Sequence, residues 1–211
     1  MTATAPPLFV VGAGGHAKVV IAALEARGEN VVGVLDDDAA KHGSKILGVS
    51  VVGACEELDH ARADAVLAIG DNATRKQLAG RLAGVSWRAV VHPRAIVHTS
   101  VRLGEGSVVL AGAVVQPDAT IGPHAIVNTA ASVDHDCELG AFVHLAPGVR
   151  LAGDVVVEEG AFVGIGASVL PGRRIGAWST VGAGAVVVDD VPPGAVSLGV
   201  PARPREGRRR T

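Results

Sequence analysis

Aliphatic residues recur at every sixth position through the second half of the chain. The positions in this phase hold valine, leucine or isoleucine without a break: Val91, Val97, Leu103, Val109, Val115, Ile121, Val127, Val133, Leu139, Leu145, Leu151, Val157, Val163, Val169, Ile175, Val181 and Val187. Four residues after each of them stands a small or aliphatic residue, with Arg173 as the exception. A period of six fits neither an α-helix, whose period is about 3.6, nor a plain strand, whose period is about 2.

The six-residue period predicts a β-solenoid, in which each hexad supplies one short strand and one tight turn. The aliphatic residue of each hexad points into the core, and the small residue fills the corner. Three hexads make one triangular coil, so residues about 18 positions apart are expected to stack on neighbouring coils, about 4.8 Å apart. We expect this solenoid, with a short C-terminal tail, over residues 89–211.

The first half of the chain differs, since short apolar runs alternate there with helical stretches. Strands are expected at 8–11, 31–35 and 65–69, and helices at 18–27 and from about 73 to 82. This alternation predicts a small parallel sheet, so residues 1–88 are expected to form a separate α/β domain of half-Rossmann type.

Composition narrows the class of protein and its partners. Apolar residues make up 48% of the chain and aromatic residues only 2%, so small and β-branched side chains must fill the core. The formal charge of −2 gives no general attraction to nucleic acid or to anionic membranes. No apolar run reaches the roughly 18 residues of a membrane span, and two cysteines without a secretion signal fit a reducing compartment. We therefore expect a cytoplasmic protein with neither nucleic-acid nor membrane partners.

Gly12, Gly14 and Ala17 follow the first expected strand with the spacing of a dinucleotide-binding turn, and acidic residues stand about 20 positions later. Such glycines let backbone N–H groups approach a pyrophosphate at a helix N-terminus. The domain has about half the size of a full dinucleotide-binding fold, and the hexads occupy the place of the second half. An NAD-linked oxidoreductase is therefore disfavoured.

Taken together, the two halves resemble the hexapeptide-repeat acyltransferases that modify sugars in bacterial surface-glycan pathways. The resemblance rests on the hexads, the turn at 12–17, Leu35-Asp36-Asp37, Ile69-Gly70-Asp71-Asn72 with Arg75, His92-Pro93, and Gly199-Val200-Pro201-Ala202-Arg203. It implies a left-handed parallel β-helix, acetyl-CoA as co-substrate, and homotrimers with active sites between subunits. The family includes N-acetyltransferases of nucleotide-linked 4-amino-4,6-dideoxyhexoses, the activity we expect here in polysaccharide biosynthesis, and sialic acid O-acetyltransferases, the alternative.

In this family the first domain holds the nucleotide-sugar acceptor. The resemblance implies two sets of acceptor-binding residues: Gly14, Gly15 and His16 at the diphosphate, and Asp36, Asp37 and Asn72 at the base or ribose. The sequence leaves the base open, because carboxylates suit uridine as well as guanosine.

His135 occupies an outward hexad position between Asp134 and Asp136. A neighbouring carboxylate fixes the tautomer of an imidazole and stabilises the imidazolium formed when it accepts a proton. The family has its catalytic His–Asp/Glu pair at this point, which makes His135 the expected general base, oriented by Asp136 or, less favoured, by Asp134. Gly153 stands one coil later, so we expect it to stack on His135 and to offer its N–H as an oxyanion or thioester contact.

The resemblance also implies residues that contact acetyl-CoA. His144 is expected to reach it from a neighbouring subunit, and Arg203 to meet its phosphates. Small residues along the outer groove are expected to expose backbone amides to the pantetheine arm: Ile165, Gly166, Ala167, Gly182 and Ala183.

Other conspicuous residues have simpler interpretations. Four histidines are expected in solvated loops or at the surface: His42, His60, His98 and His124. Cys137 fits a core position, Arg173 suggests a local bulge, and the arginines after Arg203 fit a solvated tail.

Two further classes compete with the transferase. γ-Type carbonic anhydrases use the same helix with zinc-binding histidines, but they need a pair about five residues apart that the hexads lack, so no metal is expected. A non-catalytic scaffold would be supported by a degraded site, whereas His135–Asp136 and the glycine turn are intact. Stabilisation by acetyl-CoA but not by NAD would separate the transferase from its rivals.

Overall fold

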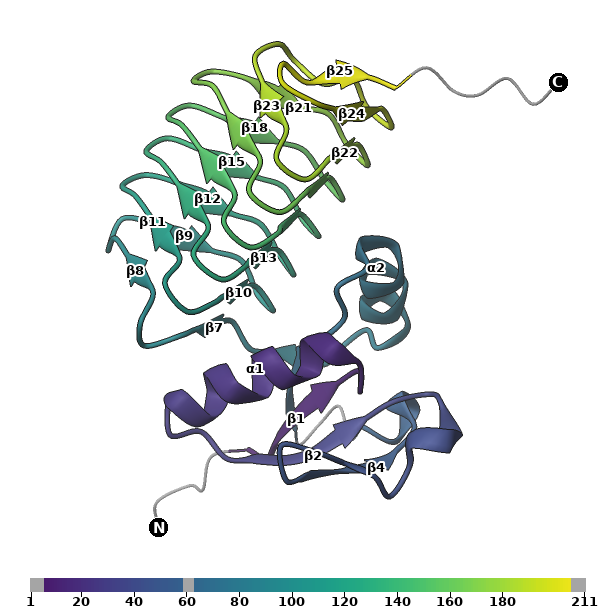
Figure 1. Cartoon of the computed structure of the whole chain (residues 1–211). Coiled ribbons are helices and arrows are strands. Elements are labelled where there is room, and N and C mark those ends of the chain that lie inside the picture. The colour runs from purple at the N-terminus through teal and green to yellow at the C-terminus, as the bar shows by residue number, and fades with distance from the viewer. Residues whose placement is uncertain (1–5, 59–62, 206–211) are drawn as a thin grey trace, which may run out of the picture.

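The computed structural model describes residues 6–58 and 63–205 (Figure 1), so His60 and the last three arginines of the tail lie outside the described residues. The N-terminal elements are β1 (Leu8–Val11), α1 (Gly15–Ala26), β2 (Val31–Leu35), β3 (Lys45–Ile46), β4 (Val49–Gly53), β5 (Asp64–Leu67), α2 (Asn72–Arg81) and β6 (Ser86–Trp87), with 3₁₀ turns at Ala39–Lys41 and Cys55–Glu57. They form one sheet in the order β3-β4-β2-β1-β5-β6. Its neighbours pair in parallel except β3 and β4, so the predicted parallel sheet is present with a hairpin added at one edge.

Helix α1 joins the N-terminal sheet to the solenoid. Its residues Val20, Ile21 and Leu24 are fully buried, in one apolar cluster with Val10 of β1 and Val108 of the first coils. Burying a side chain of this size stabilises the fold by about 1.5–3 kcal/mol. Because one core crosses from the sheet to the first coil, α1 is held beneath the solenoid rather than tethered to it by a loop (Figure 1).

The solenoid consists of two-residue strands until its last coil. They are β7 (Val90–Val91), β8 (Ile96–Val97), β9 (Arg102–Leu103), β10 (Val108–Val109), β11 (Val114–Val115), β12 (Thr120–Ile121), β13 (Ile126–Val127), β14 (Ser132–Val133), β15 (Glu138–Leu139), β16 (His144–Leu145), β17 (Arg150–Leu151), β18 (Val156–Val157), β19 (Phe162–Val163), β20 (Ser168–Val169), β21 (Arg174–Ile175), β22 (Thr180–Val181), β23 (Val186–Val187), β24 (Val196–Leu198) and β25 (Arg203–Pro204).

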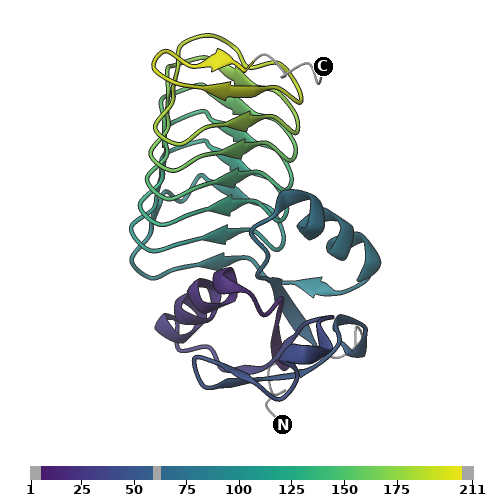
Figure 2. The ribbon, with the colours of Figure 1, turned by 45° about the vertical axis from the view of Figure 1, so that its right-hand side comes forward.

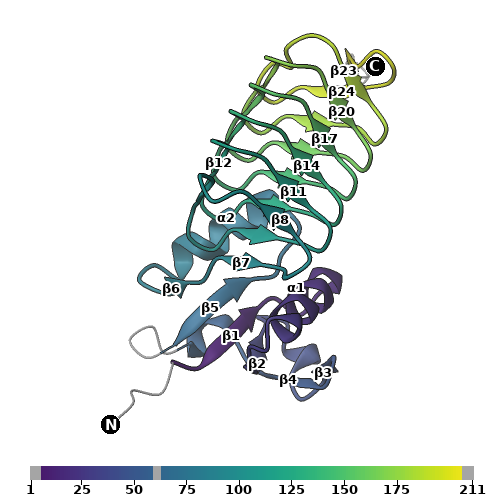
Figure 3. The same ribbon diagram turned by 90° about the vertical axis from the view of Figure 1, so that its left-hand side faces the viewer.

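These strands form the three faces of the solenoid. The first solenoid sheet has the order β25-β24-β22-β19-β16-β13-β10-β7, the second β23-β20-β17-β14-β11-β8, and the third β21-β18-β15-β12-β9. Figure 3 shows the strands of the second sheet in sequence along the solenoid. From β7 to β23, strand neighbours are parallel and 18 residues apart, as in the pair Val109↔Val127, so the predicted register is confirmed. The last strands depart from it, because β24 pairs with β22 at a separation of 16 residues and β25 pairs antiparallel with β24.

The core of the solenoid follows the hexads. Every aliphatic residue of the phase from Val109 to Val187 is buried, and Cys137 lies fully buried among them. The bulge suggested by Arg173 is wrong, because the following residues pair regularly, Val156 with Arg174 and Val157 with Ile175. The Arg173 side chain instead leaves the core and donates to the carbonyl of Pro171.

Helix α2 lies beside the solenoid, along the edge where the third sheet turns into the first (Figure 2). The N-terminal sheet ends at Trp87, and the first solenoid strand begins at Val90. Among the described residues no helix is long and apolar enough to cross a membrane.

Candidate active site

His135 lies in the turn that joins β14 of the second solenoid sheet to β15 of the third. Its Nδ1 is 2.8 Å from Oδ2 of Asp136, whose backbone has φ 58°, a left-handed conformation that aspartate tolerates. Asp134 instead accepts a hydrogen bond from the His135 backbone N–H at 2.9 Å. The ring contact therefore belongs to Asp136, and Asp134 shapes the turn.

Gly153 stacks on the His135 ring, as the 18-residue register predicted. A Cβ built on Gly153 would lie 2.5 Å from Cε1 and 2.6 Å from Nε2 of His135, so a glycine is needed to leave the ring in place. The hydrogen bond to Asp136 raises the pKa of His135 above its ordinary value. The His135 side chain is 60% exposed. A substrate or a second protein surface must therefore cover it to exclude water from the reaction.

The glycine turn opens α1 without a side-chain cap. The N-cap residue is Gly14. The N–H groups of Gly15 and His16 lie in the first turn of α1, where no earlier carbonyl of the helix can accept a hydrogen bond from them. A Cβ added at Gly14 or Gly15 would meet no atom within 4 Å, so the space over the turn is open. Together with the positive end of the helix dipole, these N–H groups suit an anion.

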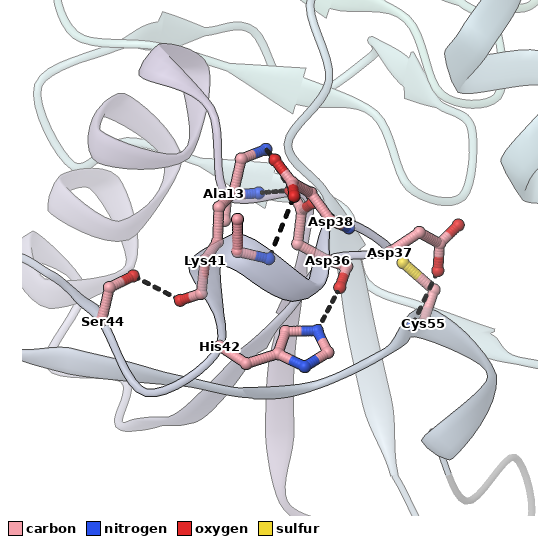
Figure 4. Close-up of polar contacts among 9 residues, drawn as sticks. Ala13, Asp36, Asp37, Asp38, Lys41, His42, Ser44 and Cys55 are labelled. Carbon is pink, nitrogen blue, oxygen red and sulfur yellow. Dashed lines mark hydrogen bonds and ion pairs between the residues drawn. The ribbon is translucent and has the colours of Figure 1, made fainter.

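Asp36 holds this turn from the end of β2 (Figure 4). Its Oδ2 accepts the Ala13 N–H at 2.6 Å, and both its oxygens lie 3.1 Å from Nζ of Lys41. Burial raises the pKa of Asp36, but the hydrogen bonds from Ala13, Asp38 and Lys41 outweigh it and lower the pKa below its usual value. Asp36 is thus partnered within the chain, and its contact with a base or ribose stays a prediction.

Asp37 points to the other side of the same loop. It accepts the Cys55 N–H at 3.1 Å and pairs with Arg81 of α2 at 2.8 Å. The hydrogen bond from Arg81 lowers the pKa of Asp37, so this carboxylate is charged at neutral pH. Its predicted contact with the base or ribose also remains a prediction.

Three cavities adjoin across this region and share lining residues. The first, about 210 Å³, is lined by Gly12, Asp36, Asp37, Cys55, Ile69, Thr74, Gln77, Leu78 and Arg81. The second, about 270 Å³, is lined by Gly12, Gly14, Gly15, His16, Asp36, Lys41, Ala68, Ile69 and Gly70. The third, about 400 Å³, is lined by Gly70, Asp71, Asn72, Ala73, Gly160, Phe162, Trp178, Ser179 and Thr180. Ile69 and Gly70 connect one cavity to the next. We call the three cavities together the acceptor groove, after the ligand that the sequence resemblance predicts there.

His144 of β16 lies behind the acceptor groove, in contact with Gly70 of its lining. Its Nδ1 lies 3.0 Å from the Gly70 carbonyl, and its Nε2 lies 3.1 Å from Nδ2 of Asn128. The Asn128 amide donates, because its Oδ1 accepts the Thr129 N–H at 2.8 Å; Nδ1 of His144 therefore carries the proton. The side chain is buried and lies against the N-terminal half, and its contact with acetyl-CoA stays a prediction.

His16 and His124 are the other histidines drawn into this region. The His16 ring lies 6.0 Å from that of His144, and its Nε2 is buried without a hydrogen-bond partner in the described part of the chain. His124, expected at the surface, is instead buried between Trp87 and Phe142, so that expectation is wrong. Burial lowers the pKa of all three histidines to about 4.

Asn72 lies at the start of α2, where it contacts the solenoid. Its side chain is buried, Nδ2 donates to the carbonyls of Gly160 and Ala161 in the solenoid, and Oδ1 accepts from Arg75. Asn72 thus fastens the start of α2 to the β-helix, and the residue also borders the third cavity. Its contact with a base or ribose stays a prediction.

The residues predicted along the cofactor groove divide into two groups. The N–H groups of Gly166, Ala167 and Gly182 already donate to the carbonyls of Pro147, Gly164 and Ser197, and the Ala167 side chain is buried. The contact of these three residues with pantetheine stays a prediction. Ile165 and Ala183 are exposed, and their N–H groups donate to no carbonyl among the described residues. Arg203 is exposed and ion-paired with Asp189 at 3.0 Å, so its contact with CoA phosphates remains a prediction.

Sequence reasoning missed the residues that shape the acceptor groove from α2 and the 39–41 turn. Lys41, Thr74, Gln77 and Arg81 line it, and Asn128 orients His144. The sequence indicates the start of α2 weakly, because an aspartate, Asp71, stands just before it as a typical N-cap residue. In the structure, Asp71 accepts the Thr74 N–H.

A parallel β-helix with an exposed His–Asp pair, joined to an α/β unit with an open glycine turn, defines the hexapeptide-repeat class of acyltransferases. Residues 7–82 match the family described as the PglD N-terminal domain. The chain is 47% identical to PerB from Caulobacter crescentus, whose structure contains CoA and GDP-perosamine, with a TM-score of 0.89 and coverage of 95% of this chain and 97% of that one. It belongs to the family of hexapeptide-repeat sugar acetyltransferases.

Other relatives agree with this assignment. The acetyltransferase domain of PglB from Neisseria gonorrhoeae is 40% identical, with a TM-score of 0.90 and coverage of 95% of this chain and 100% of that one. The UDP-N-acetylbacillosamine N-acetyltransferase of Bacillus subtilis is 43% identical over 109 residues, 48% of this chain and 50% of that protein. The match thus spans about half the length of this curated relative.

Proposed function

We propose that this protein is an acetyl-CoA-dependent N-acetyltransferase whose acceptor is a nucleotide-linked amino sugar of the 4-amino-4,6-dideoxyhexose class. The observation that carries the proposal is the His135–Asp136 pair stacked on Gly153, in a chain that also holds an open glycine turn. The relatives named above favour an amine over a hydroxyl acceptor, because two of them are N-acetyltransferases or bind an amino sugar. The sialic acid O-acetyltransferase alternative has no comparable support.

The chemistry follows from the tautomer of His135. Nδ1–H donates to Asp136, which leaves the lone pair of Nε2 to accept a proton from the attacking amine. The amine nitrogen forms a bond to the thioester carbon, and the C–S bond then breaks. The proton held on His135 passes to the departing CoA sulfur, so no covalent enzyme intermediate is needed.

Gly153 is proposed to stabilise the oxyanion. Its carbonyl accepts the Gly172 N–H in the coil ladder, whereas its own N–H has no acceptor among the described residues. One hydrogen-bond donor aimed at a developing oxyanion lowers the free energy of the transition state by about 3–4 kcal/mol.

The acceptor is proposed to lie along the acceptor groove. Its diphosphate would rest on the N–H groups of Gly15 and His16, where the buried Nε2 of His16 lacks a partner. The base would occupy the cavity bordered by Asp37, and the sugar the cavity bordered by Phe162.

We further propose a homotrimer with active sites between subunits. His144, on the first solenoid sheet, contacts Gly70 of the groove of its own chain, whereas His135 lies at the corner between the other two sheets. In a three-sided coil this corner is opposite the first sheet, so one chain cannot bring its groove to its own His135. A cytoplasmic location fits a co-substrate of the acetyl-CoA type.

The test is release of free thiol from acetyl-CoA with UDP- and GDP-linked 4-amino-4,6-dideoxy sugars, and with free and CMP-linked sialic acid. Turnover on a nucleotide amino sugar is the expected result, and it also identifies the base. Turnover on sialic acid alone would move the function to O-acetylation. Binding of acetyl-CoA with no thiol release on any acceptor would contradict the proposal.

A further inference from the structure

Arg75 of α2 is 1% exposed, and each of its five N–H groups has an acceptor. Nε donates to the His124 carbonyl at 2.9 Å, and Nη2 to Oδ1 of Asn72 at 2.9 Å and the Phe142 carbonyl at 2.7 Å. Nη1 donates to the carbonyls of Ile69 at 2.9 Å and Gly70 at 3.2 Å. The guanidinium is fully hydrogen-bonded.

These acceptors are all neutral, so the charge of Arg75 is buried without a hydrogen-bonded carboxylate, and the charge of Asp71, the N-cap of α2, offsets only part of the cost of burial. Other arginines of the N-terminal half behave differently: Arg81 pairs with Asp37, and Arg88 with Asp64. Removing an unpaired charge from water is costly, even where hydrogen bonds satisfy its N–H groups. This cost lowers the pKa of Arg75 to about 10, which still leaves it charged at neutral pH.

The carbonyls that Arg75 holds belong to the acceptor groove. Ile69 and Gly70 connect its cavities, and the His144 Nδ1–H also donates to the Gly70 carbonyl. A carbonyl oxygen turned into the groove would repel a phosphate. Arg75 and His144 keep these two oxygens turned toward the protein interior.

The diphosphate end of the groove otherwise has little net positive charge. Lys41 is the lysine that lines this cavity, and it is ion-paired with Asp36 in the same lining. The charge of Arg75 acts electrostatically on the glycine turn. Burial and His144 lower the pKa of His16 most, and Arg75 lowers it further.

We propose that Arg75 is the positioning residue for the acceptor's diphosphate: its buried, unpaired positive charge lies behind the Ile69–Gly70 peptides and attracts the diphosphate through them. This inference rests on the proposed function, since it takes a nucleoside diphosphate group as the ligand. A residue that only fastened α2 to the solenoid would affect every ligand of the groove equally. A counter-charge affects ligands in proportion to their phosphates.

The experiment compares inhibition by a nucleoside diphosphate and by its nucleoside, with the base found in the turnover assay, in wild type, Arg75→Gln and Arg75→Lys. Arg88→Gln, which removes a half-buried arginine paired with Asp64 and Glu29, is the matched control. For Arg75→Gln we expect about 10-fold weaker inhibition by the diphosphate, nucleoside inhibition within about 2-fold of wild type, a raised acceptor KM and a nearly unchanged kcat. Arg75→Lys keeps the charge and should keep the ratio of the two inhibition constants within about 3-fold.

Equal losses for diphosphate and nucleoside, or no loss for either, would overturn the inference. If Arg75→Gln does not fold, Arg75→Lys decides: a collapse of its diphosphate-to-nucleoside ratio would show that the hydrogen-bond geometry acts, not the charge. A wild-type protein that neither releases thiol nor is inhibited by any nucleoside diphosphate would instead refute the proposed function.

Discussion

Replacing Gly153 with alanine tests the stacked arrangement of the general base directly. The new Cβ would lie 2.5 Å from Cε1 of His135, whereas ordinary contacts begin near 3.4 Å, so the ring must move by about 0.9 Å. The ring is exposed and free to shift, and the backbone of Gly153 is not left-handed, so the folded state tolerates the methyl group. A misplacement of about 1 Å in a reacting group costs on the order of 100-fold in rate.

We therefore expect Gly153→Ala to lower kcat about 100-fold while acetyl-CoA binding and the melting temperature stay close to wild type. The assays are thiol release, calorimetric binding of acetyl-CoA and thermal unfolding. Gly80→Ala is the control, because Gly80 is exposed in α2 and a Cβ there meets nothing within 4 Å. Wild-type turnover by Gly153→Ala would refute the reasoning, since His135 would then work from a displaced position.

Three further predictions concern the histidines. His135→Ala should lose about 10²–10⁴-fold in turnover and still bind acetyl-CoA in a calorimeter. Because the Asp136 hydrogen bond raises the pKa of His135, Asp136→Asn should move the acidic limb of the kcat–pH profile to lower pH; an unmoved limb would contradict the assignment of the orienting carboxylate. The pKa values of His124 and His144 are lowered to about 4, so the unfolded chain binds more protons below its histidine pKa of about 6.5. The free energy of unfolding should therefore be highest above pH 6.5 and fall by about 3 kcal/mol for each of these two histidines as the pH drops to 4. Urea titrations at several pH values measure this loss, and a free energy that does not change over this range would contradict the prediction.

The solenoid could be predicted because its constraint is local and repeated. A hexad that places Val109, Val127 and Leu145 inward must also place them one above another, so the contact between His135 and Gly153 followed from counting residues. The same periodicity states which side chains point outward but not what lies outside them. His144 and His124 occupy outward positions on a face that the N-terminal half covers, which a repeat pattern cannot reveal.

One signal of the covered face was present in the sequence. The chain has only three phenylalanines, and two of them, Phe142 and Phe162, stand at outward hexad positions beside these histidines. Aromatic side chains there are more easily explained by a covering element than by solvent. The sequence shows how little bulk Gly166 and Ala167 carry, but it does not show that their N–H groups donate to the carbonyls of Pro147 and Gly164.

The docking of α2 also sets the height of the acceptor groove along the solenoid. Its partners are the backbone carbonyls of His124, Phe142 and Gly160, which occupy the same position on three successive coils. Because Arg75 and Asn72 require carbonyls at this spacing, α2 runs along the solenoid and cannot slide without losing them. The groove is thereby fixed beside His144, which belongs to the same coil as His135. In the proposed trimer, with its axis parallel to the solenoid, equivalent coils would lie at equal height, so the groove of one subunit would face the coil that carries a neighbour's His135. In that trimer, the contacts that fasten the two halves of one chain would determine which coil of the next chain meets the acceptor.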